Sequence, residues 1–187
     1  MKKKPEYHIS RVNNLIRQVP TLIEQRQHKR ALAKLKQVLI ASPNNLDALV
    51  WSAEIFRSIG DTRQSGKFFD KAIELKTDFF RAIHGRALLR YELNHLPDAI
   101  SDFNKLIELK PKIPEIYNNR GNLFLMRGDF DKALEDFDLA IALNPKSANT
   151  LNCRGWVYHK LGNLQLALED FNASLIIKHD FPSAIFN

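Results

Sequence analysis

The chain has 187 residues, 44% of them hydrophobic, and 28 Lys and Arg against 21 Asp and Glu give a formal net charge of +7. It contains no apolar run of about 18 residues, which argues against a membrane-spanning helix, and the polar residues after the first lysines argue against a secretory signal. A single cysteine, Cys153, excludes an internal disulfide and suits a reducing compartment, so we expect a cytoplasmic protein.

A pattern of small and large apolar residues recurs along the chain at a spacing of 34 residues, without insertion or deletion. A small-residue column holds Ala31, Ser65, Ala99, Ala133 and Ala167, and a large-residue column holds Leu35, Phe69, Phe103, Phe137 and Phe171. A period of this size is typical of a stacked array, in which each repeat covers the apolar face of its neighbour. We therefore expect an elongated α-solenoid rather than a single compact core.

Within each repeat, apolar residues recur twice at helical spacing, with a break between the two stretches. The break column holds Arg26, Gly60, Asn94, Gly128 and Gly162. Gly and Asn tolerate the left-handed backbone that ends one helix and turns into the next. The sequence therefore predicts an all-α protein built from helix-turn-helix repeats.

In chain order we expect a basic N-terminal tail at 1–11, five repeats at 12–45, 46–79, 80–113, 114–147 and 148–181, and the start of a sixth repeat or a capping helix at 182–187. The first repeat departs most from the pattern, because Pro20 falls inside its first helix and Arg26 replaces the turn glycine. Proline closes three of the second helices, whereas Thr77 and His179 stand in its place in the second and fifth repeats. We expect those two helices to end less sharply.

The two most regular repeats match the pattern W-x2-L-G-x2-Y, A-x3-F, P. The matching residues are Gly121, Phe124, Gly128, Ala133, Phe137 and Pro145, then Gly155, Tyr158, Gly162, Ala167 and Phe171. On these residues the chain resembles the tetratricopeptide repeat family over about nine-tenths of its length. The resemblance implies right-handed superhelical stacking, with a concave groove lined by the first helix of each repeat.

Residues of the first helices that lie outside the packing columns are the candidate peptide-binding groove. They are Trp51, Glu54, Arg57, Arg81, His84, Leu88, Tyr91, Asn118, Asn119, Asn122, Asn149, Asn152 and Trp156. Side-chain amides both donate to and accept from a peptide backbone, and Trp and Tyr are enriched at binding hot spots. The alternatives are plain solvation for the asparagines and packing between repeats for the two tryptophans.

Two further columns change together along the chain. Arg86, Arg120 and Arg154 share a column in the first helices of the last three repeats, and Asp102, Asp136 and Asp170 share one in the second helices. The first two repeats lack both, with Ser52 and Phe68 at these positions in the second. We hypothesise Arg–Asp pairs near the seam between helices, within a repeat or with the next one, that fix helix register.

The positive charge is concentrated at the N-terminal end, since residues 1–45 hold ten Lys or Arg and two acids. The candidate basic patch comprises Lys2, Lys3, Lys4, Arg26, Lys29 and Arg30. Such a patch attracts acidic proteins, anionic membranes or nucleic acid, or it is a solvated outer face. No aromatic residues interleave with these charges, which disfavours nucleic acid.

The sequence shows no metal-ligand spacing, phosphate loop or nucleophile motif, so we expect no enzyme, no metal and no cofactor. The leading hypothesis is a non-catalytic protein–protein interaction scaffold that binds an extended peptide or partner segment in the groove. One alternative is the N-terminal arm of a larger enzyme such as a transferase. Another is an assembly factor that self-associates as a homo-oligomer through its C-terminal end, because residues 182–187 are too few to cap the last repeat.

Overall fold

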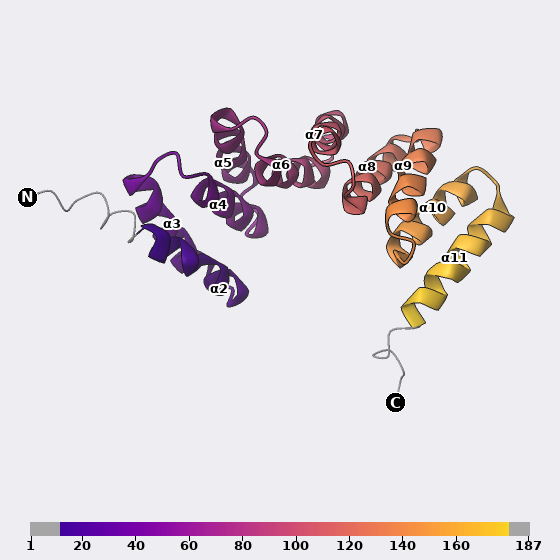
Figure 1. The fold of residues 1–187 in the computed structure, drawn as a ribbon, viewed down its shortest axis with the longest axis horizontal. Coiled ribbons are helices and arrows are strands. Elements are labelled where there is room, and N and C mark those ends of the chain that lie inside the picture. The colour runs from indigo at the N-terminus through magenta and orange to yellow at the C-terminus, as the bar shows by residue number, and fades with distance from the viewer. Residues whose placement is uncertain (1–11, 180–187) are drawn as a thin grey trace, which may run out of the picture. The chain divides into compact units, whose positions relative to one another are not determined.

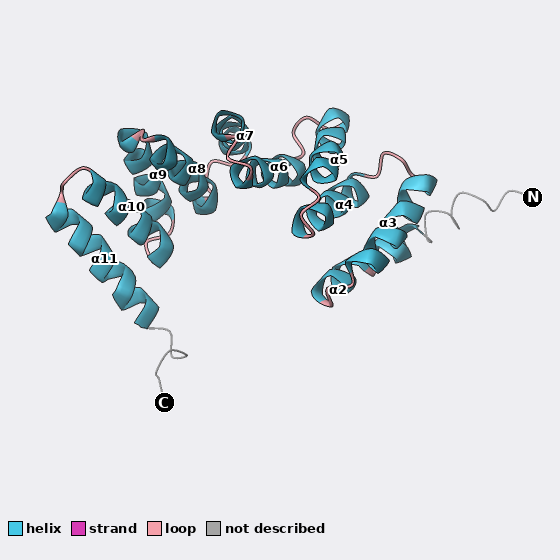
Figure 2. Ribbon diagram, turned by 180° about the vertical axis from the view of Figure 1, so that it is seen from behind, coloured by secondary structure: helices cyan, strands magenta, loops and turns pink. Residues whose placement is uncertain are grey.

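The computed structural model describes residues 12–179, and every regular element among them is a helix (Figures 1 and 2). The expectation of an all-α repeat fold is confirmed. The chain divides into two compact parts, which we call the N-terminal half (residues 1–93) and the C-terminal half (residues 94–187). The predicted tail at 1–11, with Lys2, Lys3 and Lys4, and the predicted sixth repeat at 182–187 lie outside the described residues.

In the N-terminal half, residues 12–17 are helical and precede a series of helices that pack on one another in chain order (Figure 1). These are α2 (Val19–Glu24), α3 (His28–Ala41), α4 (Leu46–Ser58), α5 (Thr62–Leu75) and α6 (Phe80–Glu92). Pro20 lies in the first turn of α2, and Gln18 forms a turn between α2 and residues 12–17. The first helix of this repeat is therefore broken, because proline cannot donate the hydrogen bond that would continue it.

In the C-terminal half, the same alternation of first and second helices continues, and each helix again packs on the next in the chain (Figure 1). The helices are α7 (Leu96–Leu109), α8 (Pro114–Arg127), α9 (Phe130–Leu143), α10 (Ala148–Lys160) and α11 (Leu164–His179). In addition, α8 contacts α10, and in the N-terminal half α4 contacts α6. Within each half, the first helices of successive repeats thus contact each other. Their solvent-facing side chains therefore share one surface.

The break column adopts the left-handed backbone at every repeat. The φ angles are 82° at Gly60, 85° at Gly128 and 78° at Gly162. Two residues that carry side chains take the same conformation, Arg26 at 56° and Asn94 at 58°. The turn geometry is therefore dictated by the repeat, and Arg26 adopts it at a steric cost that glycine avoids.

The second helices do not depend on proline for their ends. Helix α5 ends at Leu75, in the same register as α7 at Leu109 and α9 at Leu143, although Thr77 replaces proline. The expectation for Thr77 was wrong, because the extended backbone of Lys76 already ends the helix. Helix α11 runs on to His179 and is two residues longer, 16 against 14, than α9.

The small and large columns form the core. Ala31, Ala99 and Ala133 are completely buried, and so are Phe69, Phe103 and Phe137. Phe171, in the last repeat, is only half-buried. Within residues 12–179 no further helix packs on α11, so one side of Phe171 is left uncovered.

The Arg–Asp hypothesis is confirmed in the fourth and fifth repeats. Arg120 Nε and Nη2 donate to the two carboxylate oxygens of Asp136 at 2.8 and 2.6 Å, and Arg154 contacts Asp170 in the same way at 2.8 and 2.8 Å. Each pair lies within one repeat. The pKa of Asp136 is raised by burial, which outweighs the opposing effect of Arg120. This desolvation cost limits what the pair adds to net stability, and its role in fixing helix register stays a prediction.

The same arginines also reach back to the preceding second helix. Arg120 Nη1 donates to Asn104 at 2.7 Å, Arg154 Nη1 donates to Asp138 at 2.6 Å, and Arg86 Nη1 donates to Asp70 at 2.8 Å. In the fourth and fifth repeats, one guanidinium thus joins the second helices of two successive repeats. This arrangement closes the seam between α7 and α9 and the seam between α9 and α11.

Candidate functional site

The candidate surface in the N-terminal half lies on α4 and α6, where the predicted groove residues contact one another. The Arg81 guanidinium stacks over the Trp51 ring at 3.9 Å from its centroid. Its Nε and Nη2 donate to the carboxylate of Glu54 at 3.2 and 2.9 Å. A cation held between a ring and a carboxylate is already well satisfied, so this part of the surface is pre-ordered and nearly neutral.

A second ionic contact flanks this cluster. Arg57 Nη1 donates to Glu92 at 2.5 Å, which links the C-terminal ends of α4 and α6. His84 stacks on Phe80 with ring centroids 6.2 Å apart. Burial lowers the pKa of His84, the positive charge of Arg57 lowers it further, and Glu54 opposes the shift. These effects favour the neutral form of the His84 ring.

Two more predicted groove residues, Leu88 and Tyr91, are half-buried on α6. The N-terminal half thus brings together all seven of its predicted groove residues on two adjacent first helices. They form an aromatic and ionic surface in which most charges are already paired.

The candidate surface in the C-terminal half lies on α8 and α10 and consists of side-chain amides. Asn118, Asn119 and Asn122 are half-buried on α8, Asn152 is half-buried on α10, and Asn149 is exposed. Burial raises the pKa of the Cys153 thiol on α10, and the amide of Asn122 on α8 opposes that rise. The two helices contact each other, so their amides lie on one surface. We call the residues Asn118, Asn119, Asn122, Asn149 and Asn152 the amide surface.

Asn118 is the member of the amide surface with an unmet hydrogen-bonding capacity. Its Oδ1 atom is enclosed and accepts no hydrogen bond from any described residue. A buried amide oxygen without a donor costs about 1–3 kcal/mol, so such atoms are usually satisfied by a bound molecule or water.

Trp156 borders the amide surface and is 49% exposed. Its ring meets the rings of His159 and Phe171 edge-on, with centroids 5.6 and 5.7 Å apart. The indole is thus packed against its own repeat on one side and open to solvent on the other. Packing fixes the ring, and the open side offers rigid apolar contact area.

The described part of the predicted basic patch lies at the start of α3. Arg26, Lys29 and Arg30 lie there, and Arg30 Nη1 donates to Gln27 at 2.7 Å. These residues line a recess of about 580 Å³ that extends to Leu32 and Ile59.

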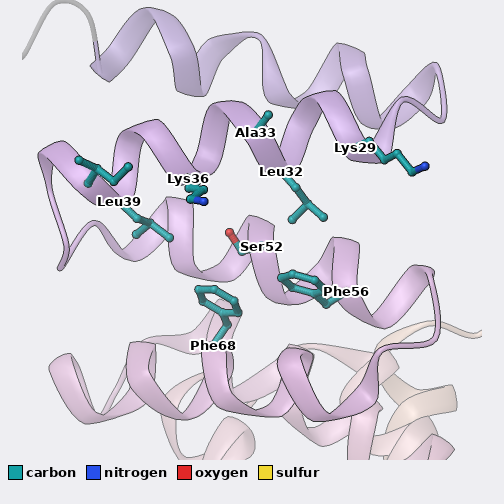
Figure 3. A pocket seen from close by; sticks show the side chains of 9 residues that line it. Lys29, Leu32, Ala33, Lys36, Leu39, Ser52, Phe56 and Phe68 are labelled. Carbon is teal, nitrogen blue, oxygen red and sulfur yellow. The ribbon is translucent and has the colours of Figure 1, made fainter.

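One feature was not predicted from the sequence: a recess of about 600 Å³ between α3 and α5, with α4 as its floor (Figure 3). Its lining residues are Lys29, Leu32, Ala33, Lys36, Leu39, Ile40, Ser52, Phe56 and Phe68. The signal was present in the columns, because Ser52 and Phe68 replace the arginine and aspartate of later repeats. The loss of a long side chain from a column leaves space that its neighbours do not fill.

Two absences among the described residues bear on the class of function. No group of three or more His, Cys, Asp or Glu side chains among them is placed to hold a metal ion. No helix within residues 12–179 is both long and apolar enough to cross a membrane.

Comparison with known proteins defines the class as a tetratricopeptide repeat array. Family models described as tetratricopeptide or TPR repeats match residues 16–78, 87–128, 114–147 and 137–169. The chain belongs to the tetratricopeptide repeat family. The resemblance proposed from the sequence is confirmed.

Among curated proteins, Protein FlbA of Caulobacter vibrioides is 34% identical over 83 residues. The match covers 43% of this chain and 14% of FlbA, so the chain corresponds to a small part of that protein.

Several solved structures share the fold. MamA from Desulfovibrio magneticus RS-1 superposes with a TM-score of 0.85 at 16% identity, covering 92% of this chain and 98% of that one. YrrB, described as a TPR protein with an unusual peptide-binding site, gives a TM-score of 0.75 at 19% identity, covering 89% and 86%. At these identities the likeness shows the fold alone.

Proposed function

We propose that the protein is a non-catalytic scaffold that binds an extended segment of a partner protein along its first helices. The observation that carries this proposal is the amide surface on α8 and α10, where half-buried amides on one first helix lie beside those on the next first helix, which it contacts. The enclosed Oδ1 of Asn118 is shielded from solvent and is not part of the contact surface.

The remaining amides suit the same ligand. Asn119, Asn122 and Asn152 are half-buried, which places their amides beside solvent without letting them rotate freely. Each side-chain amide both donates and accepts, so a row of them matches the alternating N–H and C=O groups of an extended main chain. Trp156 supplies an apolar contact at the edge for one side chain of the segment.

The surface on α4 and α6 is a separate candidate surface within the N-terminal half. Because Arg81 is already paired with Glu54 and stacked on Trp51, that surface offers little unsatisfied charge. We propose that it contributes ring contacts rather than ionic recognition. The peptide-binding site ascribed to YrrB, a protein of the same fold, adds support by analogy.

The test is selection of displayed random peptides on the wild-type protein, followed by affinity measurement on variants. The triple variant Asn118→Ala, Asn122→Ala, Asn152→Ala is expected to weaken binding by about tenfold or more, since several desolvated hydrogen bonds are lost. Asn172→Ala, which removes an amide on α11 away from this surface, is the matched control and is expected to bind as wild type. Equal affinity of the triple variant, with its helix content intact by circular dichroism, would reject the amide surface.

A second candidate function, self-association, is favoured by the outer side of α11. Large apolar residues are exposed along this helix: Leu164, Leu166, Leu168, Leu175 and Ile176. We propose that a second copy covers this face. Light scattering should show an average mass that rises with protein concentration, and the variant Leu168→Glu should remove this rise. A wild-type protein that stays monomeric at high concentration would reject self-association.

For location, the free thiol of Cys153 fits a reducing compartment, and we propose the cytoplasm.

A further inference from the structure

The recess between α3 and α5 stands where later repeats place an arginine. Ser52 occupies the column of Arg86, Arg120 and Arg154, and its short side chain turns back to donate to the carbonyl of Ala48 at 2.7 Å. In the fourth repeat, the guanidinium of Arg120 lies over the ring of Phe124 at 5.7 Å. Phe56 holds the Phe124 position in the second repeat, so the aromatic wall is kept while the cation that would lie on it is missing.

The partners of that cation are changed in the same place. The carboxylate of Asp136, which receives Arg120, corresponds to Phe68, and the amide of Asn104 corresponds to Lys36. Phe68 stacks on Phe56 with ring centroids 5.6 Å apart and an interplanar angle of 11°. In the fourth repeat this space holds an arginine between acidic and polar groups. In the second repeat the corresponding space is apolar, with Lys36 at its edge.

The geometry of the recess suits an inserted side chain. In Figure 3, Leu32 and Leu39 of α3 point toward the side on which Ser52 and Phe56 of α4 and Phe68 of α5 lie. The recess is about 600 Å³ and shares Lys29 and Leu32 with the neighbouring recess at the start of α3. The two recesses adjoin each other along α3, and we call them together the outer groove.

The charge of the outer groove has one sign. Arg26, Lys29, Arg30 and Lys36 lie along it, and none of the described residues that line either recess is Asp or Glu. Within residues 12–179 no carboxylate lies within 4 Å of the ammonium of Lys29 or Lys36. Unpaired cations beside apolar surface are complementary to a ligand that combines apolar and anionic groups.

We propose that the outer groove is a second binding site, distinct from the amide surface, for an acidic and apolar segment of a partner protein. An aromatic or aliphatic side chain of the segment enters the recess against Phe56 and Phe68. Its neighbouring carboxylates pair with Lys36 and Lys29. Two adjoining recesses along one helix suit successive side chains of a chain segment better than one small molecule.

The probe is a short fluorescein-labelled peptide that alternates Phe or Leu with Glu, and fluorescence anisotropy reports its binding to the full chain. Wild type is expected to bind it, and to bind a peptide with Lys in place of Glu at least about tenfold more weakly. The double variant Lys29→Glu, Lys36→Glu is expected to lose a similar factor. Lys71→Glu, an exposed lysine on α5 outside the groove, is the matched control and should bind as wild type.

A second variant fills the recess instead of altering its rim. The double variant Ser52→Arg, Lys36→Asp rebuilds the pairing seen between Arg154 and Asp138. It should abolish peptide binding. Its stability in urea unfolding should be no lower than that of wild type. Vesicles with and without phosphatidylserine form a separate arm. Three results would each overturn the proposal. They are no binding of the acidic peptide by wild type, binding by both variants that equals wild-type binding, and binding of wild type to anionic vesicles but not to the peptide.

Discussion

The seam around α4 and the seam around α10 are built on the same backbone pattern, yet they differ in chemistry. At α10, Arg154 joins Asp138 of α9 to Asp170 of α11 and closes the seam. At α4, Ser52 makes no such link, and an apolar recess remains between α3 and α5. The residues at three aligned positions therefore decide whether an arginine fills the space between successive second helices or an apolar recess remains there.

The same comparison applies to the first helices. On α4 and α6 the predicted groove residues satisfy one another through Arg81, whereas on α8 and α10 the amides are less fully paired, and Asn118 keeps an oxygen without a donor among the described residues. The two halves of the chain therefore present different chemistry on equivalent helices. Substitutions at matched positions in the two halves test this contrast.

The largest expected effect comes from the large-residue column. Phe137→Ala should lower the free energy of unfolding by about 3–5 kcal/mol, because the ring is completely buried and leaves a cavity. Phe171→Ala should cost clearly less, since that ring is half-buried. Urea unfolding measures both, and equal losses would show that α11 is covered as well as α9.

The next effect tests the closed seam. Asp136→Ala leaves Arg120 partly buried without its carboxylate and should cost about 1–3 kcal/mol. Replacing both partners, with Asp136→Leu and Arg120→Met, should restore most of that loss. Arg57→Met, at the more exposed pair with Glu92, is the control and should cost at most about 1 kcal/mol. A double variant as unstable as Asp136→Ala would contradict the register role.

A smaller effect, of opposite sign, is expected at the first turn. Arg26→Gly should stabilise the protein by about 0.5–1 kcal/mol, because it relieves the left-handed backbone at φ 56°. The reverse change, Gly128→Arg, should destabilise it. Thermal unfolding resolves both, and a loss of stability in Arg26→Gly would mean that the arginine side chain makes contacts that outweigh the strain.

The smallest effect concerns pH. Burial and Arg57 lower the pKa of His84 below its ordinary value of 6.5, so the unfolded chain takes up a proton that the folded protein resists. The resulting stability is present above that ordinary value and is lost as pH falls through the interval down to the lowered folded pKa. His84→Gln should flatten the unfolding free energy across this interval. An unchanged slope would show that His84 is not the responsible group.

Much of the fold could be predicted from the sequence, because the 34-residue spacing imposes both helix register and turn conformation. The Arg120–Asp136 pair could be predicted too, since both columns change together. The recess at Ser52 and the stacking of Arg81 on Trp51 could not. Both depend on side-chain conformations: which space stays empty beside a short residue, and which aromatic ring a cation stacks on. The repeat spacing does not specify side-chain conformations.

The most direct test of the central claim is the affinity of a selected peptide for the amide surface, measured by isothermal titration calorimetry. Wild type and Asn172→Ala should bind alike, and the variant with Asn118, Asn122 and Asn152 replaced by Ala should bind about tenfold or more weakly. Equal affinity in all three proteins, with the fold intact, would contradict the claim that these amides hold the partner segment.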